Sequence, residues 1–265
     1  NRSHGFFCSE SHYAAAKQIA EEGIVLLQNK NNVLPINTQQ VKRVLVVGEN
    51  AIKMMTVGGG SSSLKVQREI SPLEGLKVRL AKDGIEVDYA RGYVGDVTGN
   101  YNGVTTGQNL DDKRSEAELI AEAVEKAKTA DYVIMFGGLN KSDFQDCEGH
   151  DRKQYELPYN QDKLIEALAM ANRNFVYVNI SGNAVAMPWK AKVAGIVQGW
   201  FIGSESGEVY YADGWYKESI SLDELKNSGL EFDYSADFSS VGSGFLSVTP
   251  ILNGKRGEVV SFPLV

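Results

Sequence analysis

The sequence has little of what disulfide frameworks, metal centres, nucleic-acid surfaces and membrane spans require. Its 265 residues include two cysteines, Cys8 and Cys147, which we interpret as free thiols because they are too few for a disulfide framework or a zinc site. The three histidines, His4, His12 and His150, argue against a His-rich metal centre. A net charge of −7 argues against a nucleic-acid surface, which needs clustered Lys and Arg. The sequence contains no run of about 18 apolar residues, so no membrane span is predicted.

Two common chemical signatures are also missing. The glycine-rich stretch GGGSSS, residues 58–63, lacks the Lys-Ser/Thr of a phosphate-binding P-loop and the spacing of a dinucleotide fingerprint. No nucleophile elbow G-x-S-x-G occurs, and no histidine follows Ser204 to complete a triad. Nucleotide binding and serine hydrolysis are therefore not indicated. Three consecutive glycines do allow the backbone to approach a ligand or another domain closely, and a flexible surface turn is an equally good interpretation.

Strand-like and helix-like segments alternate through most of the chain. Continuous runs of β-branched and apolar residues predict parallel strands that are covered on both faces; they lie at 42–48, 85–92, 131–138, 174–181 and 194–201. Amphipathic or well-capped segments predict helices at 10–28, 71–84, 115–130 and 160–168. This alternation predicts an α/β fold, an α/β sandwich with a mostly parallel, doubly wound sheet.

Three other segments differ in character from these elements. Residues 93–114 form a long polar loop of the kind that is functional or disordered, and 203–215 predict a loop that leads into a helix. Residues 214–265 are polar and turn-rich, which predicts a β-rich or irregular segment. We therefore divide the chain into an α/β domain, 1–213, and a tail, 214–265. The start, NRSHGFF, has no apolar signal core, so an exported protein would already be processed or cut at this point.

The most informative feature is the acidic loop DCEGHDR, residues 146–152, which follows the strand predicted at 131–138. Loops after a buried strand, on the carboxyl edge of an α/β sheet, are where ligands bind. Crowded carboxylates raise one another's pKa while a neighbouring arginine lowers one selectively, and a general acid needs such a setting. The loop brings together Asp146, Glu148, His150, Asp151 and Arg152. The simpler alternative is a solvated loop with a structural Asp151–Arg152 ion pair and a structural His150 hydrogen bond.

The order of motifs along the chain resembles the C-terminal α/β-sandwich domain of glycoside hydrolase family 3, which includes β-glucosidases and β-xylosidases. The resemblance covers about 13–211 and rests on AAAKQIAEEGIVLLQNKNNVLPI, KRVLVVGENA with GGGSS and SPLEGL, ADYVIMFGGLN with CEGHDR and ELPYNQDKLIEAL, NISGNAVAMPW, and IVQGWFIGSESGE. The chain departs from the pattern after GSESGE, where the family's N-P-S-G-K-L-P segment is missing. Its last residues are faintly similar to the start of a fibronectin-like domain.

This resemblance implies the domain of a retaining exo-β-glycosidase that removes terminal β-linked glucose or xylose. Glu148, the Glu of E-G-x-D-R, would be the general acid/base, and Ser61 or Ser62 would face the sugar. The remaining loop residues, His150, Asp151 and Arg152, would support the loop. The nucleophile would be an Asp on a separate TIM-barrel domain, so this chain would carry half an active site.

Neither a metal nor an organic cofactor is expected for this chemistry, and the expected location is secreted or periplasmic. The alternative interpretation is a non-catalytic flavodoxin-like module that binds carbohydrate or a partner protein.

Overall fold

The computed structural model describes residues 8–56, 66–95, 100–101, 104–105, 108–147, 149–150, 152–201, 203–205, 230–240, 243–252, 255–256 and 260–264. The chain divides into two compact units, Asn1–Tyr216 and Lys217–Val265, and each is described by itself. Among the described residues, no helix combines the length and the apolar character needed to cross a membrane.

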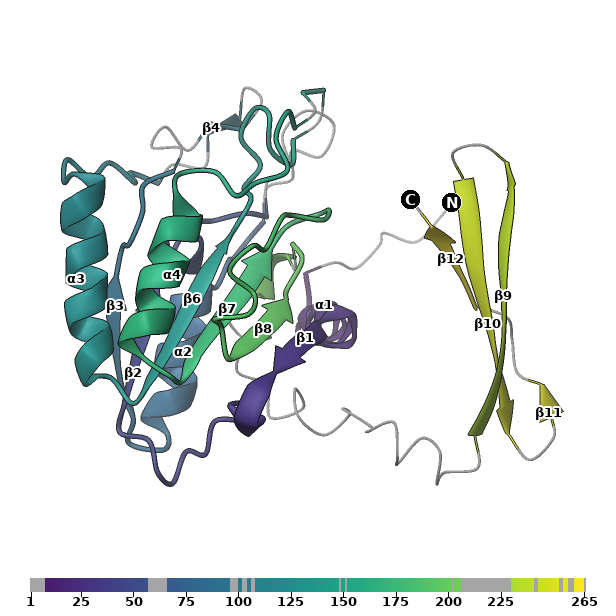
Figure 1. Cartoon of the computed structure of the whole chain (residues 1–265), viewed down its shortest axis with the longest axis horizontal. Coiled ribbons are helices and arrows are strands. Elements are labelled where there is room, and N and C mark those ends of the chain that lie inside the picture. The colour runs from purple at the N-terminus through teal and green to yellow at the C-terminus, as the bar shows by residue number, and fades with distance from the viewer. Residues whose placement is uncertain are drawn as a thin grey trace. The chain divides into compact units, whose positions relative to one another are not determined.

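The first unit is built on a six-stranded sheet with the order β1-β8-β7-β6-β2-β3 (Figure 1). Its strands are β1 Val25–Asn29, β2 Arg43–Val47, β3 Glu86–Ala90, β6 Tyr132–Gly138, β7 Phe175–Ile180 and β8 Gly195–Gln198. Only the edge strand β1 is antiparallel to its neighbour, and the other neighbouring pairs are parallel. The predicted α/β fold with a mostly parallel sheet is therefore confirmed.

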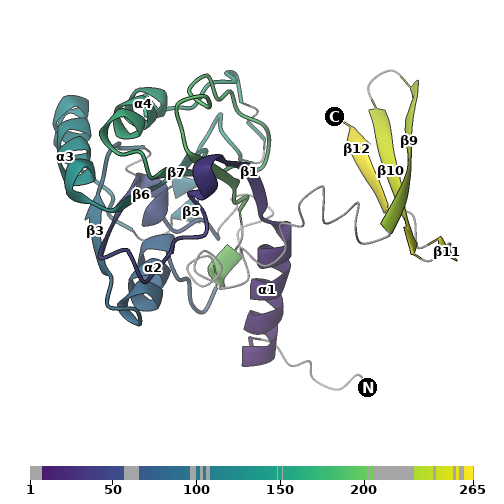
Figure 2. The same cartoon turned by 60° about the horizontal axis from the view of Figure 1, so that its bottom comes forward.

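Helices cover both faces of this sheet (Figure 2). Helix α2, Pro72–Ala81, packs on one face, while α3, Glu116–Thr129, and α4, Gln161–Ala171, pack on the other. Side chains alternate accordingly along the central strand β2: Val44 and Val46 join the core beneath α2, whereas Leu45 and Val47 join the core beneath α3 and α4. Burial on both faces explains why β2 is a continuous apolar run rather than an alternating one.

The helices begin where their capping residues predict. Ser71 accepts a hydrogen bond from the Glu74 backbone N–H, and the Glu74 carboxylate accepts one from the Ser71 N–H, which completes a capping box. The same reciprocal pair joins Ser115 and Glu118 at the start of α3. These local bonds satisfy backbone donors that a helix leaves free in its first turn.

The helix predicted at 10–28 is confirmed through Gly23 and is wrong for its last five residues, 24–28. Helix α1 spans Glu10–Gly23, and the next residues form β1, in which Val25 lies opposite Gln198 of β8. Glycine has a poor helix propensity, and the β-branched and apolar residues after Gly23 suit a strand. The free edge of β8 supplies the partner that local sequence cannot reveal.

The remaining elements are short or lie in the second unit. They are the 3-10 helices η1 Lys30–Asn32, η2 Glu49–Ala51 and η4 Gly203–Glu205, the strands β4 Asn100–Tyr101 and β5 Val104–Thr105, and, in the second unit, β9 Leu230–Ser240, β10 Ser243–Leu252, β11 Lys255–Arg256 and β12 Val260–Leu264. The short strands β4 and β5 form a hairpin within the predicted long loop. The helix expected after residue 205 falls outside the described residues. In the second unit, β10 pairs antiparallel with β9, β11 and β12. This agrees with the first of the two alternatives predicted for 214–265, a β-rich rather than an irregular segment, and the similarity of that segment to a fibronectin-like domain stays a prediction.

A glycine substitution tests the close contact between β6 and β7. Gly138 has φ +113°, and a Cβ there would lie 2.1 Å from the Ile180 carbonyl oxygen. We expect Gly138→Ala to lower the free energy of unfolding by about 3 kcal/mol or more, because strain and collision add. Gly84→Ala is the matched control: it also has a positive φ, +71°, but meets no atom within 4 Å, and it should cost about 1 kcal/mol. Urea unfolding measures both, and equal losses would contradict the collision.

Candidate active site

The strand order reverses between β2 and β6, and this is the point where open α/β sheets bind ligands. The carboxyl ends of the two strands are joined by buried polar contacts. The Asn50 side-chain amide donates to the Leu139 carbonyl oxygen at 3.0 Å, and the Asn50 backbone N–H donates to the Tyr93 hydroxyl at 3.3 Å. Polar groups therefore gather at this end of the sheet and are paired with one another.

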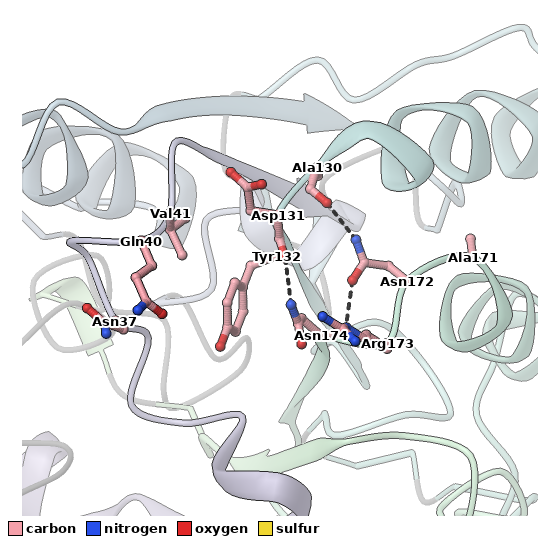
Figure 3. Close-up of a pocket in the computed structure, with 10 residues that line it drawn as sticks. All are labelled: Asn37, Gln40, Val41, Ala130, Asp131, Tyr132, Ala171, Asn172, Arg173 and Asn174. Atoms are coloured by element: carbon pink, nitrogen blue, oxygen red, sulfur yellow. Dashed lines mark hydrogen bonds between the residues drawn. The ribbon is translucent and has the colours of Figure 1, made fainter.

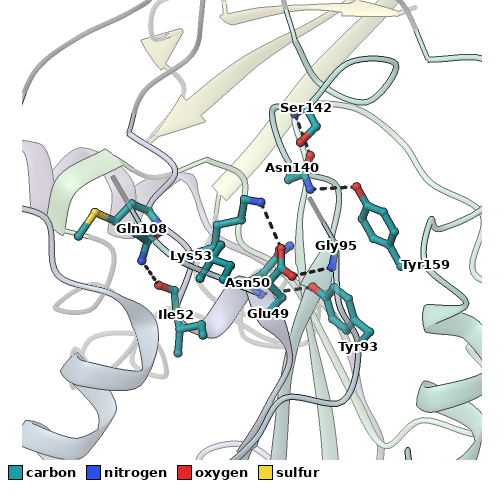
Figure 4. A network of polar contacts seen from close by, with 12 residues as sticks. Glu49, Asn50, Ile52, Lys53, Tyr93, Gly95, Gln108, Asn140, Ser142 and Tyr159 are labelled. Carbon is teal, nitrogen blue, oxygen red and sulfur yellow. Dashed lines mark hydrogen bonds and ion pairs between the residues drawn. The ribbon is translucent and has the colours of Figure 1, made fainter. Parts of the chain in front are cut away.

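A buried charged network lies directly after β2 (Figure 4). The Glu49 carboxylate has no solvent exposure and pairs with Lys53 Nζ at 3.1 Å and with Arg91 Nη2 at 2.7 Å. It also accepts a hydrogen bond from the Gly95 backbone N–H at 2.6 Å. One carboxylate thus compensates two buried cations and holds a loop backbone as well.

This network holds residues that precede two segments of the chain. Lys53 comes shortly before residues 57–65, which contain GGGSSS, and Gly95 comes directly before residues 96–99. A second contact lies just before the first of these segments: the Glu69 carboxylate accepts from the backbone N–H groups of Met55, at 2.6 Å, and Thr56, at 3.1 Å. Met55, Thr56 and Gly95, the described residues next to these two segments, are therefore each held by a carboxylate.

The acidic loop is anchored on its amino-terminal side by Asn140, which follows β6. The Asn140 carbonyl oxygen accepts from the Asp146 backbone N–H at 3.0 Å, and its side-chain oxygen accepts from the Ser142 N–H at 2.8 Å. The Asn140 side-chain amide donates to the Tyr159 hydroxyl at 3.3 Å, and the Tyr159 ring stacks on Tyr93. Through its backbone and its side chain, Asn140 therefore ties Ser142, Asp146 and Tyr159 to the end of β6.

Asp146 joins the acidic loop to the turn after β7. Its carboxylate accepts from the Gly182 backbone N–H at 2.6 Å and from the Asn183 side-chain amide at 2.5 Å. Burial raises the pKa of Asp146, while these hydrogen bonds and the nearby Arg152 charge act in the opposite direction. Carboxylate crowding was the cause expected from the sequence, but among the described residues loss of solvent is the largest cause.

His150 and Arg152 lie toward the carboxyl-terminal end of this loop. His150 Nδ1 lies 3.1 Å from a carboxylate oxygen of Asp143, and the imidazole stacks on the Phe144 ring. Arg152 Nη2 donates to the Ala184 carbonyl oxygen at 2.5 Å, which ties the carboxyl-terminal side of the loop to the β7 turn. In the described part of the chain, Arg152 Nη1 is buried without a hydrogen-bond partner, so it retains a donor for a carboxylate or a hydroxyl group.

Four predicted site residues lie outside the described residues: Ser61, Ser62, Glu148 and Asp151. Their predicted roles stay predictions. Sequence reasoning missed the buried partners Glu49, Arg91 and Asn140. The available signal was position, since Glu49 and Asn140 come just after buried strands, and Arg91 directly follows β3.

A cavity of about 450 Å³ lies at the opposite edge of the sheet, at the amino ends of β6 and β7 (Figure 3). Its lining is rich in side-chain amides, and two of these amides donate hydrogen bonds to backbone carbonyl oxygens of the protein. The Asn172 side chain donates to the Ala127 and Ala130 carbonyl oxygens, and the Asn174 side chain donates to the Asp131 carbonyl oxygen. This cavity holds none of the predicted site residues.

The buried network gives a stability prediction. Glu49→Gln removes the charge that compensates Lys53 and Arg91, so we expect a loss of about 3 kcal/mol in the free energy of unfolding. Glu86→Gln, at an exposed position at the start of β3, is the control and should change it by less than about 0.5 kcal/mol. Chemical denaturation measures both variants. Equal effects would show that the Glu49 charge is not needed.

The direction of the Asp146 pKa gives a pH prediction. The folded protein holds this proton more tightly than the unfolded chain, so stability from this group is present below about pH 4 and falls as pH rises through the raised folded pKa. The stability advantage of wild type over Asp146→Asn should therefore decrease from about pH 4 upward. Unfolding measured across a pH series checks this, and an advantage that grows with pH would mean that the hydrogen bonds outweigh burial.

Comparisons with known proteins agree with this architecture. The glycosyl hydrolase family 3 C-terminal domain matches residues 24–212. The β-glucosidase BoGH3A of Bacteroides ovatus is 49% identical over 210 residues, which cover 77% of this chain and 27% of that protein. An exo-α-(1→6)-L-arabinopyranosidase of Bifidobacterium longum is 34% identical over 209 residues, which cover 76% of this chain and 25% of that protein. The chain thus spans about a quarter of the length of these relatives.

Solved structures share the fold. A β-glucosidase from Kluyveromyces marxianus in complex with glucose superposes with a TM-score of 0.69 at 18% identity, over 96% of this chain and 56% of that one. The family 3 exo-β-xylosidase XlnD superposes with a TM-score of 0.58 at 26% identity, over 76% of this chain and 23% of that one. The family match and the identity to BoGH3A show that this chain belongs to glycosyl hydrolase family 3, of which it carries the C-terminal domain.

Proposed function

We propose that this chain is the acid/base-bearing domain of a retaining exo-β-glycosidase that removes terminal β-linked glucose or xylose from oligosaccharides or glycosides. Membership of the family and 49% identity to a β-glucosidase support the substrate class. The similarity to an exo-β-xylosidase supports the inclusion of xylose. We also propose a secreted or periplasmic location for the protein.

The observation that carries the proposal is the anchoring of the acidic loop on both sides of residue 148. Before it, Asp146 is bonded to Asn140 and to the turn after β7. After it, Arg152 is bonded to the Ala184 carbonyl oxygen of the same turn. A general acid must be held where its proton can reach the leaving oxygen, and hydrogen bonds from the neighbouring residues to fixed backbone groups restrict the loop that carries it.

In the proposed mechanism, Glu148 protonates the departing glycosidic oxygen and then deprotonates the water that releases the sugar. Retention needs a second carboxyl group about 5–5.5 Å away as nucleophile. We assign that role to an Asp on a TIM-barrel domain outside this chain, in keeping with the quarter of its relatives' length that the chain spans. Ser61 or Ser62 would contact the sugar, and the two carboxyl groups suffice without a cofactor.

The test uses the complete protein that contains this chain. Glu148→Ala should lower kcat/KM for a β-linked disaccharide by about 10²- to 10⁴-fold, because a poor leaving group needs the proton. For an activated aryl glycoside, whose leaving group needs no proton, the loss in kcat/KM should stay within about tenfold. Azide should partly restore turnover of the aryl substrate, since it attacks the glycosyl-enzyme without a general base.

Glu156→Ala is the matched control, because Glu156 is an exposed glutamate of the same loop region. It should retain activity on both substrates. An equal loss on both substrates for Glu148→Ala, without azide rescue, would rule out the acid/base role. A complete protein that hydrolyses neither substrate but binds carbohydrate would favour a non-catalytic module instead.

A further inference from the structure

The acidic loop and the residues just before it bring together three metal-ligating side chains that the proposed reaction does not use. They are the carboxylate of Asp143, the thiol of Cys147 and the imidazole of His150, and their ligand atoms all lie within 4.8 Å of one another. His150 Nδ1 is 3.1 Å from Asp143 Oδ1, and Cys147 Sγ is 4.0 Å from the same oxygen. The Cys147 thiol also donates to the His150 carbonyl oxygen at 3.5 Å, so hydrogen bonds already hold the three side chains together without an ion.

The loop's backbone produces this convergence. The backbone N–H of Gln145 donates to the Ser142 carbonyl oxygen at 3.1 Å, and Phe144 adopts a positive φ of 61°, which turns the chain tightly after Asp143. The Phe144 ring then stacks on the His150 imidazole with centroids 5.3 Å apart. This contact restrains the imidazole with its Nδ1 atom toward Asp143.

The donor set selects a class of metal ion. Carboxylate, thiolate and imidazole together suit Zn²⁺ and similar borderline ions, whereas Ca²⁺ and Mg²⁺ prefer oxygen ligands alone. Around a tetrahedral zinc ion with bonds of about 2.0–2.3 Å, neighbouring ligand atoms lie about 3.3–3.7 Å apart. The distances of 3.1 and 4.0 Å between these atoms bracket that range. The third distance, between the Cys147 sulfur and the His150 imidazole, is within 4.8 Å, so the three ligand atoms have to close by about 1 Å or less around the ion.

We propose that Asp143, Cys147 and His150 form a binding site for Zn²⁺ or a similar divalent transition-metal ion. Three protein ligands leave a fourth position for water, and Asp143 and His150 are about half exposed, so the ion has open access. The Cys147 thiol loses its proton to solvent when it binds. The sequence alone did not suggest this site, because its few cysteines and histidines match no zinc spacing pattern.

The position of the site gives it a regulatory consequence, which rests on the proposed function. Glu148 lies in sequence between the ligands Cys147 and His150. An ion bound to both ligands therefore closes a short ring that includes the backbone of residue 148. A general acid must be held where its proton can reach the leaving oxygen, and an ion that joins Cys147 to His150 restricts the chain on both sides of residue 148. Bound zinc should therefore inhibit hydrolysis reversibly.

Metal binding is tested first, on the full chain without a histidine tag. Co²⁺ added as a spectroscopic probe should give a thiolate-to-cobalt charge-transfer band at one equivalent, and Zn²⁺ should displace it. Cys147→Ser should abolish the band, and His150→Ala should weaken Zn²⁺ affinity at least about tenfold. A hundredfold excess of Ca²⁺ should leave the band unchanged, because the site contains only one hard ligand.

The double variant Cys8→Ser/His12→Ala is the matched control, since it removes the same two residue types from the amino-terminal segment. It should bind Zn²⁺ as the wild type does. Loss of binding in this control, or wild-type binding in both loop variants, would overturn the site. Unfolding of each variant without metal separates loss of a ligand from loss of the fold. His150 is exposed and Cys147 is half-buried, so His150→Ala should change stability by less than about 0.5 kcal/mol and Cys147→Ser by about 1 kcal/mol at most.

Inhibition is tested second, on the complete enzyme. Stoichiometric Zn²⁺ should reduce kcat/KM at least about tenfold, EDTA should reverse the loss, and Cys147→Ser should remove the sensitivity. Zinc binding without inhibition would leave the metal site in place and refute the regulatory role. Zinc binding by a protein without glycosidase activity would refute the proposed function alone, so the two failures are distinguishable.

Discussion

Burial of the parallel sheet on both faces is the constraint on which the rest of this structure depends. Helices cover β2, β6 and β7 from two sides, and the buried charged side chains of the described residues, Glu49, Lys53 and Arg91, all lie beyond the strand ends. Glu49 and Asn140 occupy such ends, and each carries several hydrogen bonds. The loops of the candidate site are therefore held by groups that emerge directly from the core.

Two kinds of attachment hold those loops. The Glu49 network is fully buried and charged, so removing one partner leaves the others uncompensated. The Asp146 and Arg152 contacts are partly exposed and run from side chains to the turn after β7. The first attachment joins the residues that follow β2 and β3, and the second ties the acidic loop to the turn after β7.

The acidic loop combines features that point to two chemistries. Its Glu148 matches the family's E-G-x-D-R motif, whereas Asp143, Cys147 and His150 form a donor set that the proposed glycosidase reaction does not need. Both lie in one short stretch whose ends are anchored. A ligand that binds the outer residues of the loop therefore acts on the same segment that carries the proposed general acid.

Local sequence determined the strands, the capped helices and the family, because apolar runs, capping boxes and ordered motifs are properties of neighbouring residues. It also located the acidic loop on the carboxyl edge of the sheet. Only the tertiary structure decided that residues after Gly23 form β1, since the partner strand is far along the chain. The same holds for the Glu49–Arg91 pair, the burial of Asp146 and the meeting of Asp143 with His150. Each of these depends on desolvation or a long-range contact, which no sequence pattern specifies.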